Sequence, residues 1–286
     1  MKTWCVLDLI QWTTEYFKRY DIPSPRLDAE LLLSHVLGTS RLQLYLRFEM
    51  PVFPEHLSAF RELIKKRTAY VPVSYLTSRK EFFSLEFYVD SRVLIPRPET
   101  EVLVEHVLKA QGAPCQLLDI GTGSGAIAIS LAVNRPEWEI LATDISAEAL
   151  EVAQKNAVAH KCADRLTFLQ GNLFEPLETL PDSRFDWIVS NPPYVSTKEY
   201  PSLPPNVRDH EPEIALLAGV DGHEVIVGIL NGAPRFLKPG GRVALEIGHN
   251  HSHEVQDLVQ SNSAYSECQV IKDYSSVERV VIATAG

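Results

Sequence analysis

The fold of this chain is decided by one stretch, Leu118-Asp119-Ile120-Gly121-Thr122-Gly123-Ser124-Gly125-Ala126. Apolar residues precede the stretch and a helical pattern follows it, so it joins the end of a strand to the start of a helix. Glycines at alternate positions let the backbone turn tightly and approach a ligand closely, and the helix N-terminus presents free amide donors. The pattern predicts a nucleotide-type binding loop.

The acidic residue beside this loop narrows the choice of ligand. Gly121, Gly123 and Ala126 also match the dinucleotide fingerprint, so the glycines alone discriminate poorly. A carboxylate at Asp119 would repel a pyrophosphate and hold a ligand ammonium, which favours the cationic amino-acid end of S-adenosylmethionine. A glycine loop that only packs a helix remains the alternative. The residues expected to bind the cofactor here are Asp119, Gly121, Thr122, Gly123, Ser124 and Gly125.

Around this loop, apolar strands alternate with helical stretches, which indicates a doubly wound parallel sheet covered on both faces. Ligands of such folds lie at the carboxyl ends of the strands. The predicted strands are Gln116–Ile120, Glu139–Thr143, Leu166–Gln170, Phe185–Ser190, Arg242–Ile247, Cys268–Lys272 and Arg279–Ala283. The predicted helices are Gly125–Asn134, Ala147–Ala159, His223–Leu237 and His251–Val259.

The second and third predicted strands end in polar residues that fit the rest of such a ligand. Asp144 follows the glycine loop at about the 20-residue spacing of an acid that binds both ribose hydroxyls. A place near the N-cap of the helix at Ala147 is its structural alternative. Asn172 and Leu173 could border an adenine ring, and a surface turn is the alternative for them. Asp144, Asn172 and Leu173 therefore complete the expected cofactor site.

The fourth predicted strand ends in Asn191-Pro192-Pro193-Tyr194. Two prolines remove backbone donors and stiffen the turn, so its free groups are acceptors. The Asn191 side-chain oxygen and the Pro192 carbonyl could accept both protons of one planar amino group, while Tyr194 stacks on its face. We expect Asn191 to Tyr194 to bind the substrate, and Asn191, Pro192 and Tyr194 to be catalytic.

This turn addresses a specific chemical problem. An amide or aminopurine nitrogen is a poor nucleophile because its lone pair is delocalised. Two acceptors would bend it toward a tetrahedral nitrogen aimed at an electrophilic methyl carbon, so positioning and electrostatics supply most of the acceleration. No general base is obligatory before transfer. The alternative is a rigid loop without chemistry, since Asn-Pro and Pro-Pro mark many turns.

The N-terminal part follows a different pattern. Its only glycine before residue 112 is Gly38, and apolar residues recur at helical spacing up to about Ala69, which predicts several short helices. Prolines separate them, namely Pro23, Pro25, Pro51 and Pro54. From Phe82 to Ile95 the alternation of aromatic and aliphatic residues predicts a hairpin with its turn at Asp90-Ser91. A helix is expected at Thr100–Lys109, introduced by Arg97 and Pro98.

Composition and charge exclude several classes. The 286 residues are 45% hydrophobic and 22% charged, which rules out a disordered or collagen-like chain. Residues 1–80 hold 12 Lys and Arg against 8 Asp and Glu, whereas the remainder holds 15 against 29. A basic module could therefore face an acidic or nucleic-acid-bearing partner. The alternative is a solvated helix face, comprising Arg61, Lys65, Lys66 and Arg67.

Compartment and metal content follow from simpler observations. Four single cysteines without Cys-x-x-Cys pairs predict no metal site and no disulfide framework. Asp8 interrupts what would be the apolar part of a signal peptide, so export is not expected. The longest apolar run, 126–133 with Ser130 inside it, is far shorter than the roughly 18 residues of a membrane span. We therefore expect a cytoplasmic protein with no membrane association.

At these residues the sequence resembles a class I S-adenosylmethionine-dependent methyltransferase of the kind that methylates planar nitrogens. Over nearly its full length it is similar to the bacterial peptide-chain release-factor glutamine methyltransferase family. Matching segments beyond the glycine loop are Leu94-Ile95-Pro96-Arg97-Pro98-Glu99-Thr100-Glu101, Asn191 to Tyr194, Glu211-Pro212, Ala215-Leu216 and Glu246-Ile247-Gly248. One departure is that the family usually has Asp, and often Trp, where this chain has Asn172 and Leu173.

The resemblance implies a fold and an activity. The fold would be α/β, a Rossmann-like seven-stranded methyltransferase domain at 99–286, with a small helical substrate-recognition domain at 1–80 and a β-hairpin linker at 81–98. The activity would be methyl transfer to the glutamine side-chain nitrogen (N5) in the Gly-Gly-Gln motif of class 1 release factors, leaving S-adenosylhomocysteine. The enzyme is expected to be monomeric and not to bind nucleic acid directly.

The same resemblance implies roles for individual residues. The loop Gly121 to Gly125 and Asp144 would bind the cofactor, and Asn191 to Tyr194 the glutamine, with Asn191 also near the methyl donor. Three charged residues near the start of the helix at residue 100 would shape the mouth of the pocket, although an ion pair or a helix cap would explain them equally well. These residues are Arg97, Glu99 and Glu101.

Three rival functions remain open on the residues alone. An N6-adenine methyltransferase acting on DNA or RNA would use the same turn, because adenine also presents a planar amino group. The net charge of −14 on residues 81–286 argues against a polyanionic substrate. A nicotinamide oxidoreductase would give no role to Asp119 or Asn191, and a non-catalytic module that retains the fold is the third rival.

Overall fold

The computed structural model describes residues 4–180 and 183–286. The chain forms two compact units: unit 1 runs to Arg79 and includes Pro204–His210, and unit 2 comprises Lys80–Leu203 and Glu211–Gly286. Residues 1–3, part of the stretch behind the expectation about export, lie outside the described residues. No described helix combines the length and the apolar character needed to cross a membrane.

Unit 1 is helical, as predicted. Prolines open two of its helices, because Pro25 and Pro54 each occupy the first helical position, where an amide donor is not needed. Its helices are α1 (Val6–Lys18), α2 (Pro25–Val36), α3 (Arg41–Tyr45), α4 (Pro54–Thr68), α5 (Val73–Thr77) and α9 (Pro205–Arg208).

The core of unit 1 is formed by the apolar faces of α1, α2 and α4, with Phe17, Leu32 and Phe60 almost fully buried. Arg67 lies on the same inner face of α4, only 6% exposed, and its Nε donates to Asp28 Oδ2 at 2.7 Å. Arg67 therefore does not belong to the exposed basic face that the sequence predicts. It consists of the exposed residues Arg61, Lys65 and Lys66.

Unit 2 begins with a hairpin shorter than expected. β1 (Lys80–Phe82) and β2 (Leu85–Phe87) pair antiparallel, and the turn between them is Phe83-Ser84, where both residues have positive φ. The predicted hairpin turn at Asp90-Ser91 is wrong. Asp90 instead forms a separate turn, in which its Oδ1 accepts from the backbone N–H of Arg92 at 3.0 Å. The chain continues through η1 (Pro98–Thr100) into α6 (Glu101–Ala110).

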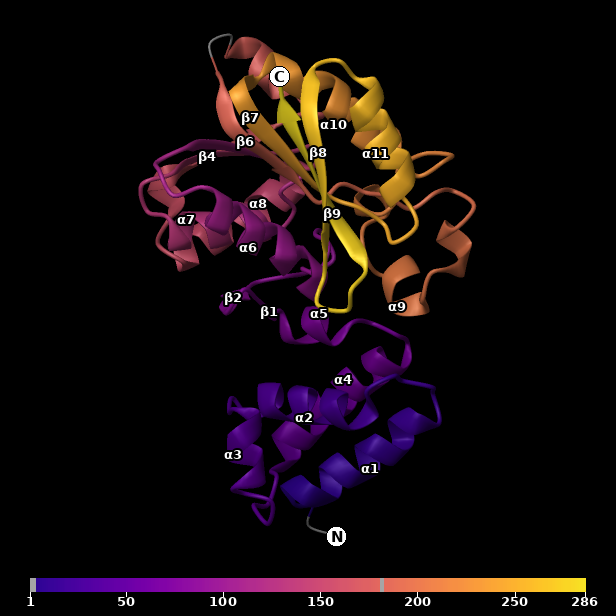
Figure 1. Ribbon diagram of the computed structural model, residues 1–286. Coiled ribbons are helices and arrows are strands. Elements are labelled where there is room, and N and C mark those ends of the chain that lie inside the picture. The colour runs from indigo at the N-terminus through magenta and orange to yellow at the C-terminus, as the bar shows by residue number, and fades with distance from the viewer. Residues whose placement is uncertain (1–3, 181–182) are drawn as a thin grey trace. The chain divides into compact units, whose positions relative to one another are not determined.

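All seven predicted strands are present in one sheet. They are β3 (Gln116–Ile120), β4 (Glu139–Asp144), β5 (Leu166–Gln170), β6 (Phe185–Ser190), β7 (Leu237–Glu246), β8 (Tyr265–Lys272) and β9 (Glu278–Ala285). Their order is β5-β4-β3-β6-β7-β9-β8. Figure 1 labels β4, β6, β7, β8 and β9. The sheet is mixed, because β9 runs antiparallel to β7 and β8. The link 273–277 between β8 and β9 is too short for a parallel crossover.

Helices cover both faces of the sheet. α6, α7 (Ala126–Asn134) and α8 (Ala147–Ala159) pack on one face, and α10 (Glu224–Gly232) and α11 (Ser252–Ser261) on the other (Figure 1). The predicted helix to Leu237 stops at Gly232, because Pro234 lacks an amide donor. Short 3-10 turns complete the unit: η2 (Ala163–Arg165), η3 (Glu175–Thr179), η4 (Tyr200–Ser202), η5 (Glu213–Ala215) and η6 (Ala233–Arg235).

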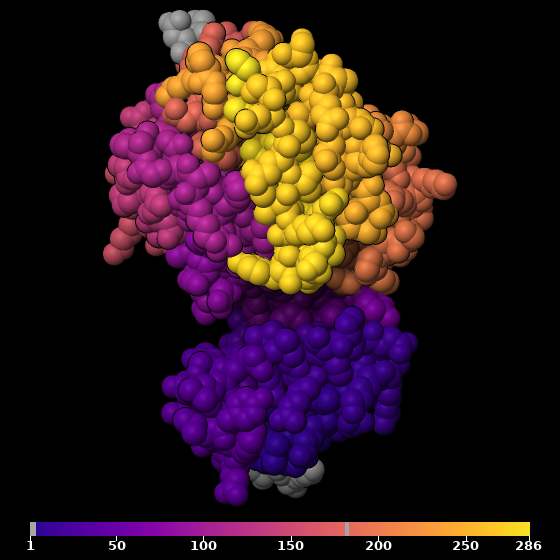
Figure 2. All heavy atoms as spheres, viewed as in Figure 1, coloured from indigo at the N-terminus to yellow at the C-terminus, as the bar shows by residue number. Residues whose placement is uncertain are grey.

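A large apolar cluster joins the sheet to α10 and α11. Ile188 and Leu245 of the sheet, Ile229 of α10 and Val255 of α11 are all buried in it. The C-terminal segment that carries α11, β8 and β9 is yellow in Figure 2 and covers much of the face turned to the viewer. The rigid sheet between these layers holds the loops at its strand ends in place.

Candidate functional site

Four parallel strands of unit 2 end at one edge of the sheet. Ile120 of β3 pairs with Thr143 of β4 and with Ser190 of β6, and Asp144 pairs with Gln170 of β5. The Ser190 hydroxyl also donates to the Ile120 carbonyl at 2.7 Å, which ties β6 to β3. The loops that follow these strands therefore start side by side, as the topology of doubly wound sheets requires.

These loops enclose a cavity of about 240 Å³. Eight of the predicted site residues line it: Gly121, Gly123, Asp144, Asn172, Leu173, Asn191, Pro192 and Pro193. The structure thus brings the predicted cofactor loop, the ribose acid and the Asn-Pro-Pro turn to one cavity. Thr122, Ser124, Gly125, Asp119 and Tyr194 do not line it.

The glycine loop is built for close approach. Gly121 and Gly123 have φ values of +71° and +56°, and nothing lies within 4 Å of where a Cβ would stand on either. Glycine is needed at position 125 for another reason, because a Cβ there would stand 2.6 Å from the Ile129 side chain of α7. The N–H groups of Gly121 and Thr122 both donate to the Thr143 carbonyl, at 2.8 and 3.0 Å. These two backbone bonds help to set the shape of the loop.

Asp119 lies beneath this loop instead of on the cavity wall. It is fully buried, and its Oδ2 accepts from the Thr122 hydroxyl at 2.7 Å and from the Ala128 N–H at 3.3 Å. Among the described residues its Oδ1 has no hydrogen-bond partner. Burial raises the pKa of Asp119 to about 7. The structure shows Asp119 supporting the loop from beneath, and its contact with a ligand ammonium stays a prediction.

Asp144 reaches the cavity and also braces the loop. Its Oδ2 accepts from the Gly123 N–H at 2.8 Å, and its Oδ1 accepts from the Ser146 N–H at 2.9 Å. Burial raises the pKa of Asp144 in spite of these bonds. The N-cap of α8 is Ser146, whose hydroxyl accepts from the Ala149 N–H at 3.1 Å. The alternative capping role therefore belongs to Ser146, and Asp144 faces the cavity.

Part of the cavity wall is apolar. Leu173 follows β5 in a left-handed conformation with φ of +49°, close to Gly228 of α10, where a Cβ would stand 2.7 Å from its Cδ1. Ile145 is 47% exposed beside Asp144. The other apolar lining residues are Ala149, Ile214, Ala215, Leu217, Val225 and Ile229. A flat apolar ring could pack in this part of the cavity.

Asn191 is oriented by two side chains behind it. Its Nδ2 donates to Thr100 Oγ1 at 3.1 Å, and the Thr100 hydroxyl donates to Glu246 Oε2. Thr100 and Glu246 are 4% and 1% exposed. Burial raises the pKa of Glu246 to about 7. Among the described residues, Asn191 Oδ1 has no hydrogen-bond partner, so it is available to a ligand in the cavity.

Tyr194 packs against the apolar cluster, and a Cβ on Gly248 would stand 3.3 Å from its ring. Burial, with a smaller effect of Glu246, raises its pKa to about 12. Tyr194 is half-buried against this cluster and does not line the cavity, and stacking of its ring on a substrate stays a prediction.

Two of the three residues expected to shape the mouth of the pocket, Arg97 and Glu101, make other contacts. Arg97 donates through Nη2 to the buried Glu211 at 2.6 Å, and Glu101 accepts from the Phe83 N–H at 2.9 Å. Glu211 accepts in addition from the Ile95 N–H at 3.1 Å. Arg97, Glu99 and Glu101 do not line the cavity, and the ion-pair alternative holds for Arg97. The pair fixes Pro212, which follows Glu211 and does line the cavity.

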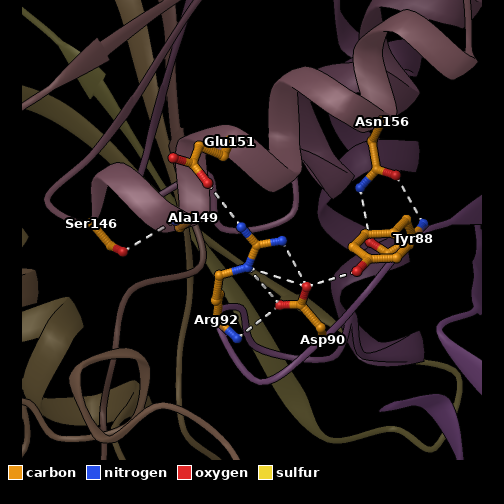
Figure 3. Close-up of polar contacts among 7 residues, drawn as sticks. All are labelled: Tyr88, Asp90, Arg92, Ser146, Ala149, Glu151 and Asn156. Atoms are coloured by element: carbon orange, nitrogen blue, oxygen red, sulfur yellow. Dashed lines mark hydrogen bonds and ion pairs between the residues drawn. The ribbon is translucent and has the colours of Figure 1, made fainter. Parts of the chain in front are cut away.

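Sequence reasoning missed the segment after the hairpin. Arg92 lines the cavity, and its guanidinium bonds Asp90 at 2.7 Å and Glu151 of α8 at 2.9 Å (Figure 3). Arg92 holds the pKa of Asp90 at about 2. The signal that could have found this segment is the Asp-Ser-Arg turn, which places acid and guanidinium two residues apart.

Asn156 of α8 joins this segment to the glycine loop. Its Oδ1 accepts from the Tyr88 N–H at 2.8 Å, and its Nδ2 donates to the Tyr88 carbonyl at 3.0 Å (Figure 3). The same Nδ2 donates to the Ser124 carbonyl at 2.8 Å. Asn156 is 1% exposed, so water does not compete for these bonds. One amide therefore positions two walls of the site.

No group of three or more His, Cys, Asp or Glu in the described residues is placed to hold a metal ion. The four cysteines are free, and Cys115 and Cys162 are buried. The polar side chains that line the cavity are one guanidinium, one carboxylate, two amides and three hydroxyls, namely Arg92, Asp144, Asn172, Asn191, Thr143, Ser146 and Ser190. This set suits a polar organic ligand.

Two family models match the chain. Residues 8–77 match the PrmC N-terminal domain, and residues 98–203 match the methyltransferase small domain. The chain is 43% identical to the release factor glutamine methyltransferase of Rhodopirellula baltica, over 97% of this chain and 95% of that protein. It is 40% identical to the protein of the same name from Chlorobaculum tepidum, over 97% and 96% of the two chains.

Solved structures share the fold at lower identity. The hMettl16 catalytic domain in complex with MAT2A 3'UTR hairpin 6 is 16% identical, with a TM-score of 0.59 over 76% of this chain and 80% of that chain. A methyltransferase from Pyrococcus furiosus is 22% identical, with a TM-score of 0.54 over 78% and 99%. At these identities the likeness concerns the fold alone.

Proposed function

Because this chain belongs to the release factor glutamine methyltransferase family, we propose that it methylates the glutamine side-chain nitrogen in the Gly-Gly-Gln motif of class 1 peptide-chain release factors. The methyl donor would be S-adenosylmethionine. One observation carries this proposal: the Asn191-Pro192-Pro193 turn and the loop of Gly121 and Gly123 line the same cavity. A methyl acceptor and a nucleotide-bearing donor could therefore meet there.

The cavity fits this donor in three respects. The open space in front of Gly121 and Gly123 would admit a ligand against the backbone. The Asp144 carboxylate would accept from ribose hydroxyls, and the apolar wall around Ile145 and Leu173 would receive the adenine. When bound, S-adenosylmethionine would supply an electrophilic methyl carbon on a sulfonium sulfur and would leave as S-adenosylhomocysteine.

The residues of the turn would prepare the acceptor nitrogen. Asn191 Oδ1 and the Pro192 carbonyl would each accept one N–H of the glutamine amide. These bonds favour a tetrahedral nitrogen whose lone pair points at the methyl carbon, because they pull both N–H bonds out of the amide plane. Transfer would replace the carbon–sulfur bond of the donor by a carbon–nitrogen bond, and one proton would then leave the nitrogen for solvent. Positioning supplies most of the acceleration.

Unit 1 would bind the protein substrate. Its exposed basic face of Arg61, Lys65 and Lys66 stands apart from the acidic composition of residues 81–286, so it would attract an acidic protein surface. Replacing Arg61 and Lys65 by Glu should raise KM for an intact release factor and leave KM for a Gly-Gly-Gln peptide unchanged. Equal KM changes for both substrates would contradict this assignment.

The decisive experiment locates a transferred label. Purified protein is incubated with methyl-labelled S-adenosylmethionine and one of three acceptors: an intact class 1 release factor, its Gly-Gly-Gln Gln→Ala form, or double-stranded DNA. Label on the unmodified factor alone is expected. Label on DNA would move the chain to the adenine-methylating alternative, and label on both forms of the factor would place the methyl group on another residue.

A further inference from the structure

Three buried or half-buried side chains from distant parts of unit 2 form a linear hydrogen-bond chain. Asn191 Nδ2 donates to Thr100 Oγ1 at 3.1 Å, and the Thr100 hydroxyl donates to Glu246. Asn191 follows β6, Thr100 ends η1 and Glu246 ends β7. We propose that Thr100 and Glu246 are positioning residues that select the amide orientation of Asn191 in which Oδ1 faces the substrate.

The selection follows from the single hydrogen of a threonine hydroxyl. When that hydrogen is donated to Glu246, only lone pairs remain on Thr100 Oγ1, so Thr100 can accept and cannot donate. The asparagine group that faces Thr100 must then be the NH2 group. The carbonyl oxygen of the same amide is left for the cavity, which Asn191 lines.

Without this hydrogen-bond chain nothing would distinguish the two orientations of the Asn191 amide, because they have nearly the same shape and volume. The flipped orientation would present an NH2 group to the NH2 group of the substrate, so two donors would face each other and no hydrogen bond would form. The nitrogen would lose one of the two acceptors that bend it. Water does not offer Thr100 an alternative partner, because Thr100 and Glu246 are 4% and 1% exposed.

The position of Glu246 favours its role as the terminal acceptor. The bond from Thr100 and the charges of Arg279 and Arg97 favour the carboxylate, but burial and Glu99 oppose them, and the pKa of Glu246 is raised to about 7. Glu246 is therefore a pure acceptor above about pH 7, and the activity tests of the hydrogen-bond chain are made at about pH 8. A buried acceptor at this end gives the chain its polarity, and the polarity is transmitted through one hydroxyl to Asn191.

Paired variants of Thr100 test the chain. Thr100→Val keeps the shape and removes the hydroxyl, whereas Thr100→Ser keeps the hydroxyl. Since the inference rests on the proposed function, the first readout is methyl transfer to an intact release factor. Thr100→Val should lower kcat about 10- to 100-fold with unchanged cofactor Kd, and Thr100→Ser should stay within about threefold of the parent. Thr100→Val also leaves the buried Glu246 without its donor, so its melting temperature should fall, and both variants are assayed well below that temperature. Equal kcat in Thr100→Val and the parent would overturn the inference.

Paired variants of Glu246 test the acceptor end. Glu246→Gln retains a carbonyl oxygen that can accept from Thr100, and Glu246→Leu retains none. We expect the leucine variant to lose kcat as Thr100→Val does and the glutamine variant to lose much less. In an Asn191→Ala background, Thr100→Val should cause no further loss, because both act through one residue. Additive losses would show that Thr100 acts by another route.

A second readout does not depend on activity. The side-chain NH2 signals of Asn191, identified by their loss in Asn191→Ala, should show hydrogen-exchange protection in the parent and in Thr100→Ser, and none in Thr100→Val. Protection lost in Thr100→Val without any methylation by the parent would leave the orientation chain standing and refute the proposed function. Unchanged protection in Thr100→Val would refute the role of the hydrogen-bond chain, whether or not the protein methylates a release factor.

Discussion

The two halves of the site are held in place by different means. The backbone of the glycine loop after β3 is held from several sides, by bonds from the Gly121 and Thr122 N–H groups to the Thr143 carbonyl and from the Gly123 N–H to Asp144. The turn after β6 has its functional amide oriented by side chains, from Asn191 through Thr100 to Glu246. A loop that binds through backbone groups needs particular conformations, whereas a turn that binds through one side chain needs a particular hydrogen-bond direction.

This difference predicts where small changes matter. Around the loop, a substitution acts by strain or by lost support, and it should appear in cofactor affinity and in stability. At the turn, a substitution that removes one polar group should lower the rate of transfer and have little effect on cofactor affinity or stability. The four predictions below separate these two kinds of effect, in order of decreasing magnitude.

The largest effect is expected at the turn itself. Asn191→Ala removes an acceptor for the substrate amide at the end of a strand, so kcat/KM should fall about 10³-fold while the melting temperature stays within a degree or so. Asn134→Ala, which changes an asparagine at the end of α7 that does not line the cavity, is the matched control and should retain most activity. Retained activity in Asn191→Ala would refute the assigned mechanism.

A stability effect is expected at the link between the loop and the segment that carries Arg92. Asn156→Ala leaves the Tyr88 N–H and the Ser124 carbonyl without partners in a buried place, which should lower the unfolding free energy by about 3 kcal/mol in denaturant titration. Asn134→Ala removes one bond to the Ser130 carbonyl at the end of α7 and should cost under about 1 kcal/mol. Equal losses would show that Asn156 has no special linking role.

At the cavity, Asp144→Ala should raise the Kd for S-adenosylmethionine about 30-fold in calorimetry, because it removes a charged acceptor and the brace on Gly123. Asp144→Asn keeps one oxygen and should weaken binding less. With saturating cofactor, kcat should change little in either variant. An unchanged Kd for Asp144→Ala would contradict the ribose assignment.

The smallest effect concerns the buried acid beneath the loop. The pKa of Asp119 is raised to about 7 in the folded protein, so the folded state binds a proton that the unfolded state has released between about pH 4 and pH 7. The wild type therefore loses stability as pH rises through that window. The unfolding free energy of Asp119→Asn, relative to wild type, should increase by about 2 kcal/mol from pH 5.5 to pH 7.5. A constant difference would contradict the raised pKa.

Much of the fold could be predicted because its signals are local. Seven strands and the helices between them follow from apolar periodicity, and the family expectation is confirmed by relatives that span nearly the whole chain. The errors are also local in origin. The hairpin of residues 82–95 was predicted too long, because alternation of apolar residues continues past the true turn at Phe83-Ser84.

The sequence by itself determined which residues gather at the strand ends, because parallel strands of a doubly wound sheet bring their carboxyl ends to one edge. Gly121, Gly123, Asp144 and Asn191 could be assigned to one site on that ground. Only the tertiary structure decided that Asp119 and Tyr194 do not line the cavity, and that a distant threonine and glutamate orient Asn191. The reason is physical: backbone topology is encoded in local periodicity, whereas the direction of a side chain depends on what packs against it from elsewhere in the chain.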